Sequence, residues 1–365
     1  MIHGKWRQAL GIGCGLMLQF PHFLVAQPTD KAKDAGSALH LAVSVQGPVT
    51  IKRQGWSGQA PVVFGTYLRI GDLLHLEDFS LVKVVCSDLS LHDLRPGIAG
   101  VPCIGAQPVM HRRDGSLINP TRGGEGRGSQ LLVVSPRKTK VLSPHPLLRW
   151  TAVEGASRYR VTVRGPNLTW TSQVDDVTRL EYPAWAPDLK TGVDYKLIVE
   201  VDGKSSATEP GLGLGFSLVG AEERKGVARE EKKVEELGLS AGATQFLVAH
   251  LYAGHGLNAE AIQRLEDISG SFKVSAVARV LAELYLSLGL TRHAEAAYLN
   301  LLNLSREEGD RESGMLAHVS LARIYGVLGN KKLILEHLDA ALFSANEIGD
   351  QQTAGQAKRM MAEMR

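Results

Sequence analysis

The sequence predicts a multidomain protein in which two all-β modules precede an all-α helical repeat. Three observations lead to this fold class. In two stretches between residues 40 and 219, apolar and polar residues alternate with a period of two, as in strands with one buried face. After Ala221 the period changes to 3.6, and a set of small residues then recurs three times. With 365 residues, 44% hydrophobic and 22% charged, the chain has room for two or three globular domains.

Residues 1–26 resemble an export signal in their order of residue types. Two basic residues precede a mostly apolar run from Ala9 to the small residue Ala26. The alternative is a membrane anchor, but Gln19 and Pro21 interrupt the run. We therefore expect this signal peptide to be cleaved, which gives a periplasmic or secreted protein with no membrane span after signal removal.

The mature chain is expected to be nearly neutral. Removing Lys5 and Arg7 from the 41 basic residues leaves 39, against 38 acidic residues. The overall charge therefore gives no indication of nucleic-acid binding.

The remaining cysteines, Cys86 and Cys103, are predicted to form a disulfide. Export places them in an oxidising compartment, where an even number of cysteines favours a bond. Two unpaired buried thiols are the alternative. Zinc is disfavoured, because only His92 lies between the two cysteines and a structural zinc site takes four ligands.

Residues 40–105 form the first predicted β module. The stretch "HLAVSVQGPVTIK" alternates strictly around the turn "QGP", and "PVVFGTYLRIGDLLHL" and "SLVKVVC" add further short strands. With Gly47, Gly65, Gly71 and Asp72, this order resembles the FecR-like domain of bacterial envelope proteins over about residues 40 to 100. The sequence departs from that family in having "SDLS" at a turn and in its cysteine pair. FecR itself is a transmembrane signal transducer, and this activity does not carry over to a chain without an internal membrane span.

Residues 106–140 are predicted to be a Gly-rich basic linker. The stretch from His111 to Lys140 contains seven Arg or Lys residues and only two acidic residues, Asp114 and Glu125. A solvated tether is the expected role of such a segment. The alternative is attraction to an anionic polysaccharide of the cell envelope.

Residues 141–219 form the second predicted β module. Trp150 precedes an alternating strand, and Leu189, Gly192 and Tyr195 have the spacing L-x-x-G-x-x-Y. This spacing lets a tyrosine hydroxyl bond to backbone a few residues upstream, at the corner between two sheets. The segment resembles a fibronectin type III-like domain. Trp150 and Tyr195 are expected in its core, and Trp170 and Trp185 are expected to pack rather than to stack on sugars.

Residues 222–365 are predicted to be helical. A charged amphipathic helix, "EERKGVAREEKKVEEL", comes first. Three copies of one pattern then start at Ala249, Ala282 and Ala322, which are 33 and then 40 residues apart. Each copy places a tyrosine, a glycine and usually a second alanine at the same offsets, and this resembles the tetratricopeptide repeat over about residues 240 to 350. The small residues allow paired helices to approach closely, glycine ends the first helix of each pair, and a capping helix closes the stack.

One motif of catalytic type occurs in this region. "GLSAG", residues 238–242, matches the nucleophile elbow, but it follows a charged helix rather than a strand. Ser240 is therefore expected to cap the next helix. His250 and His255 lack the spacing and the glutamate of a zinc protease. The sequence predicts no catalytic residue, no cofactor and no metal site.

The expected function is a non-enzymatic scaffold that binds a protein or peptide partner in the cell envelope. In the repeat family, the residue after each first alanine faces the binding groove, which implies His250, Glu283 and Arg323 here. Their mixed charge suggests a polar, non-acidic ligand. The alternative is binding of peptidoglycan or envelope polysaccharide by the β modules and the basic linker.

Overall fold

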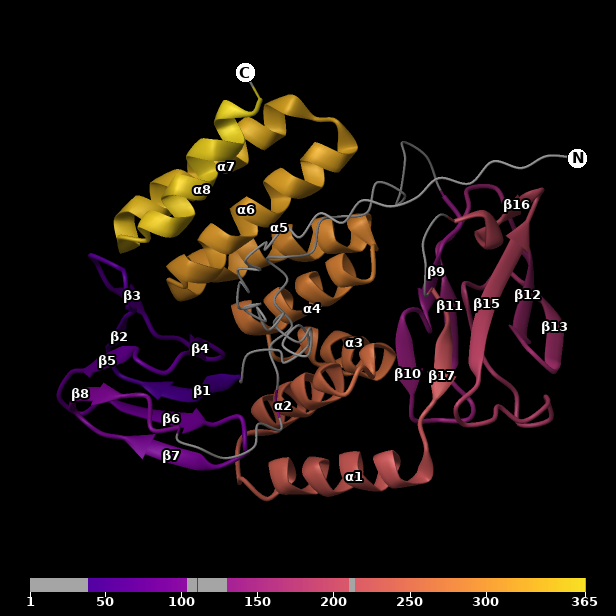
Figure 1. The fold of residues 1–365 in the computed structure, drawn as a ribbon, viewed down its shortest axis with the longest axis horizontal. Coiled ribbons are helices and arrows are strands. Elements are labelled where there is room, and N and C mark those ends of the chain that lie inside the picture. The colour runs from indigo at the N-terminus through magenta and orange to yellow at the C-terminus, as the bar shows by residue number, and fades with distance from the viewer. Residues whose placement is uncertain (1–38, 104–109, 111–129, 210–213, 365) are drawn as a thin grey trace, which may run out of the picture. The chain divides into compact units, whose positions relative to one another are not determined.

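Figure 1 shows the computed structural model of the chain, which describes residues 39–103, 110, 130–209 and 214–364. Within these residues, strands up to residue 218 precede helices that begin at residue 221. This confirms the predicted order of a β region followed by a helical region. The expected signal peptide and most of the predicted linker lie outside the described residues.

Residues 39–103 form the β module, which consists of two four-stranded sheets. Their strand orders are β4-β1-β6-β7 and β3-β2-β5-β8. The bounds are β1 His40–Gln46, β2 Val49–Lys52, β3 Ala60–Pro61, β4 Tyr67–Leu68, β5 Leu73–Leu76, β6 Leu81–Val85, β7 Leu91–Leu94 and β8 Gly97–Gly100. Leu41 and Ile51 are fully buried, as the period of two predicts. Gly47, with φ of 74°, turns the chain from β1 in one sheet to β2 in the other.

Residues 130–209 and 214–219 form a sandwich of two further sheets. One has the order β10-β17-β15-β12-β13, with β16 paired to β15, and the other has the order β14-β11-β9. The bounds are β9 Val133–Ser135, β10 Thr139–Val141, β11 Leu147–Trp150, β12 Arg158–Gly165, β13 Leu168–Asp175, β14 Arg179–Glu181, β15 Asp194–Val201, β16 Lys204–Ser205 and β17 Phe216–Leu218. The backbone N–H of Lys190 donates to the Tyr195 hydroxyl over 2.8 Å, which confirms the predicted tyrosine corner.

The sandwich begins before the predicted boundary at residue 141. Residues 130–140 were expected in the linker, whereas this stretch contains β9 and most of β10. Val133 is buried in the sandwich core, and β10 pairs in parallel with β17, some 75 residues later in the chain. Of the basic linker residues, Arg137 is itself buried and paired with Glu209. The basic character of this stretch therefore belongs in part to the folded sandwich.

The helices pack mainly against their neighbours in sequence. Their bounds are α1 Ala221–Glu235, α2 Ala241–Gly254, α3 Asn258–Ser269, α4 Ser275–Ser287, α5 Thr291–Glu308, α6 Arg311–Leu328, α7 Lys331–Ile348 and α8 Gln351–Ala362. The pairs α2–α3, α4–α5 and α6–α7 correspond to the three copies of the sequence pattern. The step of 40 residues exceeds the step of 33 because α5, with 18 residues, is longer than α3, with 12, and because the alanine of the next copy lies further along α6 than along α4. The shorter connection between α5 and α6 offsets part of this difference.

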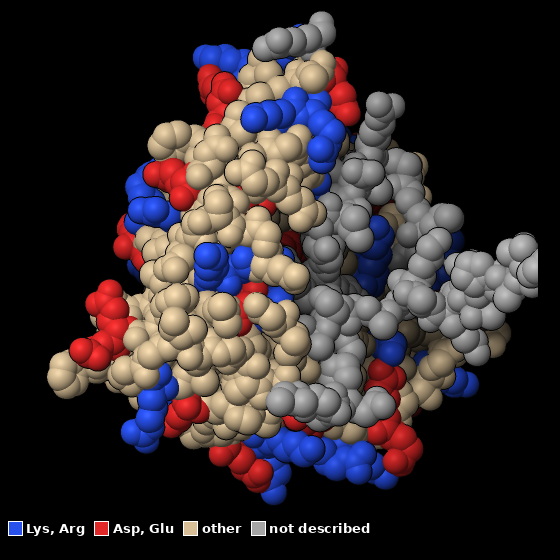
Figure 2. Space-filling view, turned by 60° about the vertical axis from the view of Figure 1, so that its left-hand side comes forward, with Lys and Arg blue, Asp and Glu red and all other residues tan. Residues whose placement is uncertain are grey.

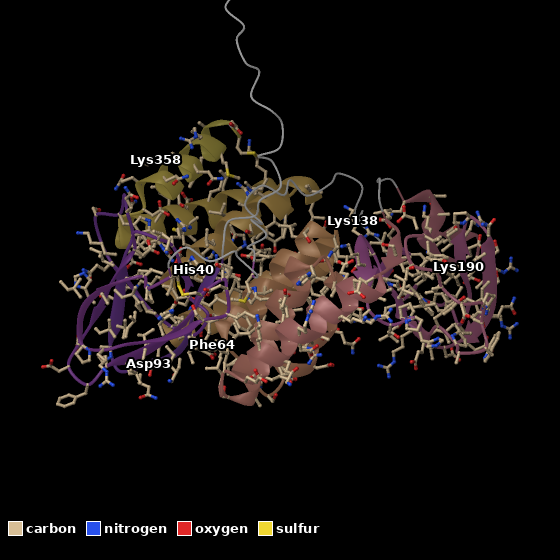
Figure 3. All side chains as sticks on the ribbon, turned by 60° about the horizontal axis from the view of Figure 1, so that its bottom comes forward. His40, Phe64, Asp93, Lys138, Lys190 and Lys358 are labelled. Carbon is tan, nitrogen blue, oxygen red and sulfur yellow. A yellow bond between two sulfur atoms is a disulfide. The ribbon has the colours of Figure 1, made fainter. Side chains whose placement is uncertain are left out.

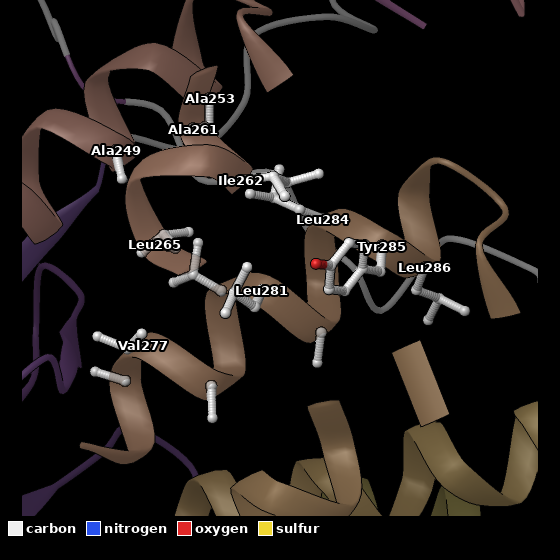
Figure 4. Packing of buried hydrophobic residues seen from close by; sticks show 14 of the residues in the cluster. Ala249, Ala253, Ala261, Ile262, Leu265, Val277, Leu281, Leu284, Tyr285 and Leu286 are labelled. Carbon is white, nitrogen blue, oxygen red and sulfur yellow. The ribbon is translucent and has the colours of Figure 1, made fainter. Parts of the chain in front are cut away.

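Small residues hold the paired helices together, as predicted. The alanines of the pattern are at most 1% exposed, namely Ala249, Ala261, Ala282, Ala294 and Ala322. In Figure 4, Ala261 of α3 lies next to Ala253 of α2, and Leu265 of α3 lies near Leu281 of α4. Gly256, Gly289 and Gly329 have φ of 72° to 76°, so each supplies the left-handed turn after the first helix of its pair. Among the helices of the described residues, none has both the length and the apolar character needed to cross a membrane.

Candidate functional site

The β module covers the face formed by the first helices of the pairs, where the groove was expected. His250 of α2 is 5% exposed, and its ring meets Tyr67 of β4 edge-on, with 5.9 Å between centroids. The Arg279 guanidinium of α4 lies 4.3 Å from the centroid of the same Tyr67 ring. Glu283 accepts a hydrogen bond from Arg279 Nε over 3.0 Å. Arg323 is half-buried on α6, where its charge acts on Tyr298 of α5. At His250 the expected open groove is therefore filled by the chain itself.

An aromatic residue of the β module anchors it to the helices. Phe64, which is labelled in Figure 3, packs against Phe246 of α2 and against Phe272. The ring centroids are 5.2 Å and 4.9 Å away. A Cβ atom added to the next residue, Gly65, would lie only 2.2 Å from the Cβ of Ala276 in α4. The backbone of the module thus approaches the helix so closely that only glycine fits at this position.

A buried ionic cluster joins the same two parts of the chain. Arg53 Nη1 lies 2.5 Å from Asp72 Oδ2, and Arg53 Nη2 lies 2.5 Å from Glu312 Oε2 of α6. Nη2 also donates to the carbonyl oxygen of Tyr67 over 2.8 Å. Burial alone would raise the pKa of the Glu312 carboxyl, but Arg53 and Arg279 outweigh it and hold that pKa below its usual value. The charged form of Glu312 is therefore favoured, whereas burial raises the pKa of the Asp72 carboxyl against the opposing charge of Arg53.

The sandwich contacts other parts of the helices through polar groups. Buried Arg137 donates from Nε to the carbonyl oxygen of Leu288 over 2.7 Å, while its Nη1 donates to Glu209 over 2.7 Å. Arg149 of β11 makes a bidentate pair with Glu266 of α3, at 2.7 Å and 3.0 Å. These contacts hold the β sheets and the helices together in one compact unit.

An open cleft of about 450 Å³ lies between the sandwich and helices α2 and α3. Its polar lining comes from both sides and includes Ser143, His145, Gln245, Gln263, Arg264 and Asp267. Arg264 is held in place because Nη1 donates to Gln245 over 2.5 Å and the guanidinium lies 5.2 Å from the Tyr252 ring centroid. The cleft thus has a fixed cation and several hydrogen-bonding groups at its wall.

Glu260 adds a partly satisfied carboxyl group to the same cleft. Its Oε1 accepts a hydrogen bond from the backbone N–H of Leu142 over 2.6 Å. Its Oε2 is buried and has no hydrogen-bond partner among the residues that the structure describes. Burial raises the pKa of this carboxyl group. The cleft therefore has unused hydrogen-bonding capacity next to a positioned arginine.

Cys86 and Cys103 form a disulfide bond with 5.4 Å between their Cα atoms. His40 lies beside them, and one ligand atom from each of the three residues lies within 4.8 Å of the others. In this structure the two sulfur atoms are bonded to each other, so neither is a thiolate, which is the form that binds metals. His40 Nδ1 accepts a hydrogen bond from the backbone N–H of Ser87 over 3.0 Å.

Ser240 and His255 have structural partners. Ser240 Oγ accepts a hydrogen bond from the backbone N–H of Ala243 and caps α2, and Gly238 has φ of 65°, so the predicted cap is confirmed. His255 Nε2 lies 2.6 Å from Glu230 Oε2 of α1.

A histidine pair joins α6 and α7. His318 Nδ1 lies 2.9 Å from His337 Nδ1, and the His337 ring stacks on Tyr325 with 5.4 Å between centroids. Such a bond needs one N–H and one lone pair, so at least one of the two rings is neutral when it forms. Burial, followed by the charges of His337 and Arg306, lowers the pKa of His318 to about 4.

Acidification is expected to destabilise the protein through His318. Between its usual pKa of 6.5 and its folded value of about 4, the unfolded chain binds a proton that the folded chain excludes. The free energy of unfolding should therefore fall by up to about 1.4 kcal/mol per pH unit over this window. Urea unfolding at pH 7, 6, 5 and 4 measures this slope. The variant His318→Gln should show a shallower slope, and an unchanged slope would contradict the assignment.

Comparison with known proteins gives little further information. No protein-family model matches the chain, and no curated protein matches it. Among solved structures, it is similar to a polysaccharide lyase at 10% sequence identity and a TM-score of 0.19. The match covers 80% of this chain, which spans 62% of the length of the lyase. A TM-score of 0.19 does not relate two folds.

Proposed function

We propose that the chain is an exported, non-enzymatic scaffold of the bacterial cell envelope that binds a polypeptide partner. In this proposal the β module is FecR-like, the sandwich is fibronectin type III-like, and the helices form a tetratricopeptide-type repeat. Repeats of this kind act by presenting faces to other polypeptides. Here the first-helix face is engaged by the β module at Phe64, Tyr67 and Arg53. The partner is therefore assigned to the cleft between the sandwich and α2–α3.

The observation that carries this proposal is the open cleft of about 450 Å³, which is of the size of an ordinary ligand site and whose lining mixes apolar side chains such as Leu147 and Ile268 with polar ones. An extended peptide offers alternating N–H and C=O groups, which complement the hydroxyl and amide groups of Ser143, Gln245 and Gln263. The unused oxygen of Glu260 supplies an acceptor for polar side chains, and Arg264 lies at the wall, paired with Glu231 over 3.2 Å. On the face shown in Figure 2, basic and acidic side chains are interspersed.

A cross-linking experiment tests the assignment. A photoreactive amino acid is placed at position 263, in the cleft, or at position 358, on exposed α8, in the full-length exported protein. Irradiation of intact cells should yield a polypeptide adduct from position 263 and none from position 358. The adduct partner is then purified and titrated against Gln263→Arg, which fills the cleft, and Lys358→Ala as the control.

We expect Gln263→Arg to weaken binding at least tenfold and Lys358→Ala to leave it unchanged. Equal adducts from both positions, or wild-type affinity of Gln263→Arg, would rule out the cleft as the partner site. Salt-sensitive binding to purified peptidoglycan with no polypeptide adduct would favour the alternative function, a polysaccharide-binding protein.

A further inference from the structure

The sandwich displays one tryptophan on its surface. Trp185 is 77% exposed, whereas Trp150 and Trp170 in the same sandwich are 3% and 6% exposed. A large aromatic side chain gains more from burial than almost any other, so leaving it in water forgoes that gain. Both Trp170 and Trp185 were expected to pack, and only Trp170 does.

The loop that carries Trp185 is held in place. The Tyr182 hydroxyl donates to the carbonyl oxygen of Pro187 over 2.6 Å, which ties together the two ends of the loop. Within the loop, the backbone N–H of Ala186 donates to the carbonyl oxygen of Pro183 over 3.0 Å. Ala186 itself is buried, so it anchors the loop to the core. The exposed indole is therefore held by an ordered loop backbone and not by a flexible segment.

Trp185 cannot fold back into the core beneath its loop, because other aromatic side chains fill that part of the core. Trp170 and Tyr182 pack edge-to-face beneath the loop, with ring centroids 5.0 Å apart. The Trp185 ring rests against Trp170 at 6.1 Å and an interplanar angle of 61°. The buried rings thus support the exposed indole from below and leave most of its surface open.

The surroundings of Trp185 favour a sugar over a protein surface. Within the described residues of the sandwich, Val177, at 41%, is the other large hydrophobic side chain that is exposed. A protein docking site usually needs a wider apolar patch around its anchor. Polar residues flank the ring in the sequence, namely the exposed side chains of Glu181, Asp188 and Lys190. The charge of Asp188 acts on the Tyr182 hydroxyl, which places this carboxylate close to the loop.

We propose that Trp185 is the stacking platform of a saccharide-binding subsite on the sandwich, which takes an uncharged pyranose ring of a glycan. The apolar C–H face of the sugar lies on the indole, and the sugar hydroxyls bond to the flanking polar side chains. This inference does not depend on the scaffold function, because Trp185 does not line the cleft that is assigned to the polypeptide partner.

Titration of the full-length mature protein with oligosaccharides tests the subsite. The probes are cellohexaose and N-acetylchitohexaose, and binding is measured by calorimetry and by the intrinsic tryptophan fluorescence. We expect at least one probe to bind, Trp185→Ala to weaken binding at least tenfold, and Trp185→Phe to keep it within about threefold because the aromatic face remains. Phe79→Ala is the matched control, because it removes an aromatic side chain that is 98% exposed on the β module.

Three results would overturn the proposal. The first is the absence of binding of both probes to the wild-type protein. The second is wild-type affinity in Trp185→Ala, and the third is an equal loss of affinity in Phe79→Ala, which would indicate non-specific contact with exposed aromatic rings. The scaffold proposal would survive each of these results, since its test uses the cleft variants.

Discussion

Replacing Arg53 with methionine is expected to lower the free energy of unfolding by about 3–5 kcal/mol. The substitution leaves the carboxylates of Asp72 and Glu312 buried, with side-chain exposures of 3% and 9%, and without the cation between them. Two like charges in a poorly solvated site repel each other, and neither can regain its hydration. The loss should also loosen the contact between the β module and α6, because Glu312 belongs to that helix.

Urea unfolding followed by circular dichroism measures this effect. Lys83→Met is the control, because the pair of Lys83 with Asp93 is exposed and should contribute less than about 1 kcal/mol. A triple variant, with Arg53→Met, Asp72→Leu and Glu312→Leu, removes all three charges and should recover most of the lost stability. If Arg53→Met costs no more than Lys83→Met, the cluster does not stabilise the contact.

Substituting Gly65 by alanine is expected to cost about 2–4 kcal/mol, which combines overpacking with the left-handed backbone. The new Cβ would lie 2.2 Å from the Cβ of Ala276, which is far too close for two non-bonded carbon atoms. The φ of Gly65 is 76°, a conformation that residues with a side chain adopt at a cost. The β module must therefore shift away from α4, and Tyr67 and Phe64 would shift with it.

A matched control separates these two contributions. Gly55 has φ of 86°, and a Cβ there would meet no atom within 4 Å, so Gly55→Ala measures the backbone cost alone. The difference between the two variants is the cost of the contact. Combining Gly65→Ala with Ala276→Gly should recover part of it, and equal effects of Gly65→Ala and Gly55→Ala would show that the close approach is absent in solution.

Local features of the fold could be predicted from the sequence because each depends on residues that are close together in the chain. The left-handed glycines at positions 256, 289 and 329, the tyrosine corner at Tyr195 and the helix cap at Ser240 each depend on residues within a few positions. Backbone geometry fixes the spacing of such features, so the spacing alone identifies them. The buried alanines of the repeat follow from the same periodicity.

The candidate sites could be predicted only in part from the sequence. Arg53 and Glu312 are 259 positions apart, and nothing in their neighbourhoods distinguishes them from surface charges. Asp72 was singled out within the "IGD" turn of the FecR-like pattern, but not as the partner of an arginine. The start of the sandwich was not predicted, because β10 joins the sheet by pairing with β17 and the two strands are far apart in the sequence.

The sequence by itself determined the order of β and helical regions, the paired helices and the turns between them, because each of these follows from a local period or a local backbone requirement. Only the tertiary structure decided that the β module covers the first-helix face, that a cleft stays open beside α3, and that Trp185 is exposed while Trp170 is buried. These outcomes depend on the fit between surfaces that exist only after each part has folded, and a linear pattern of residue types does not encode that fit.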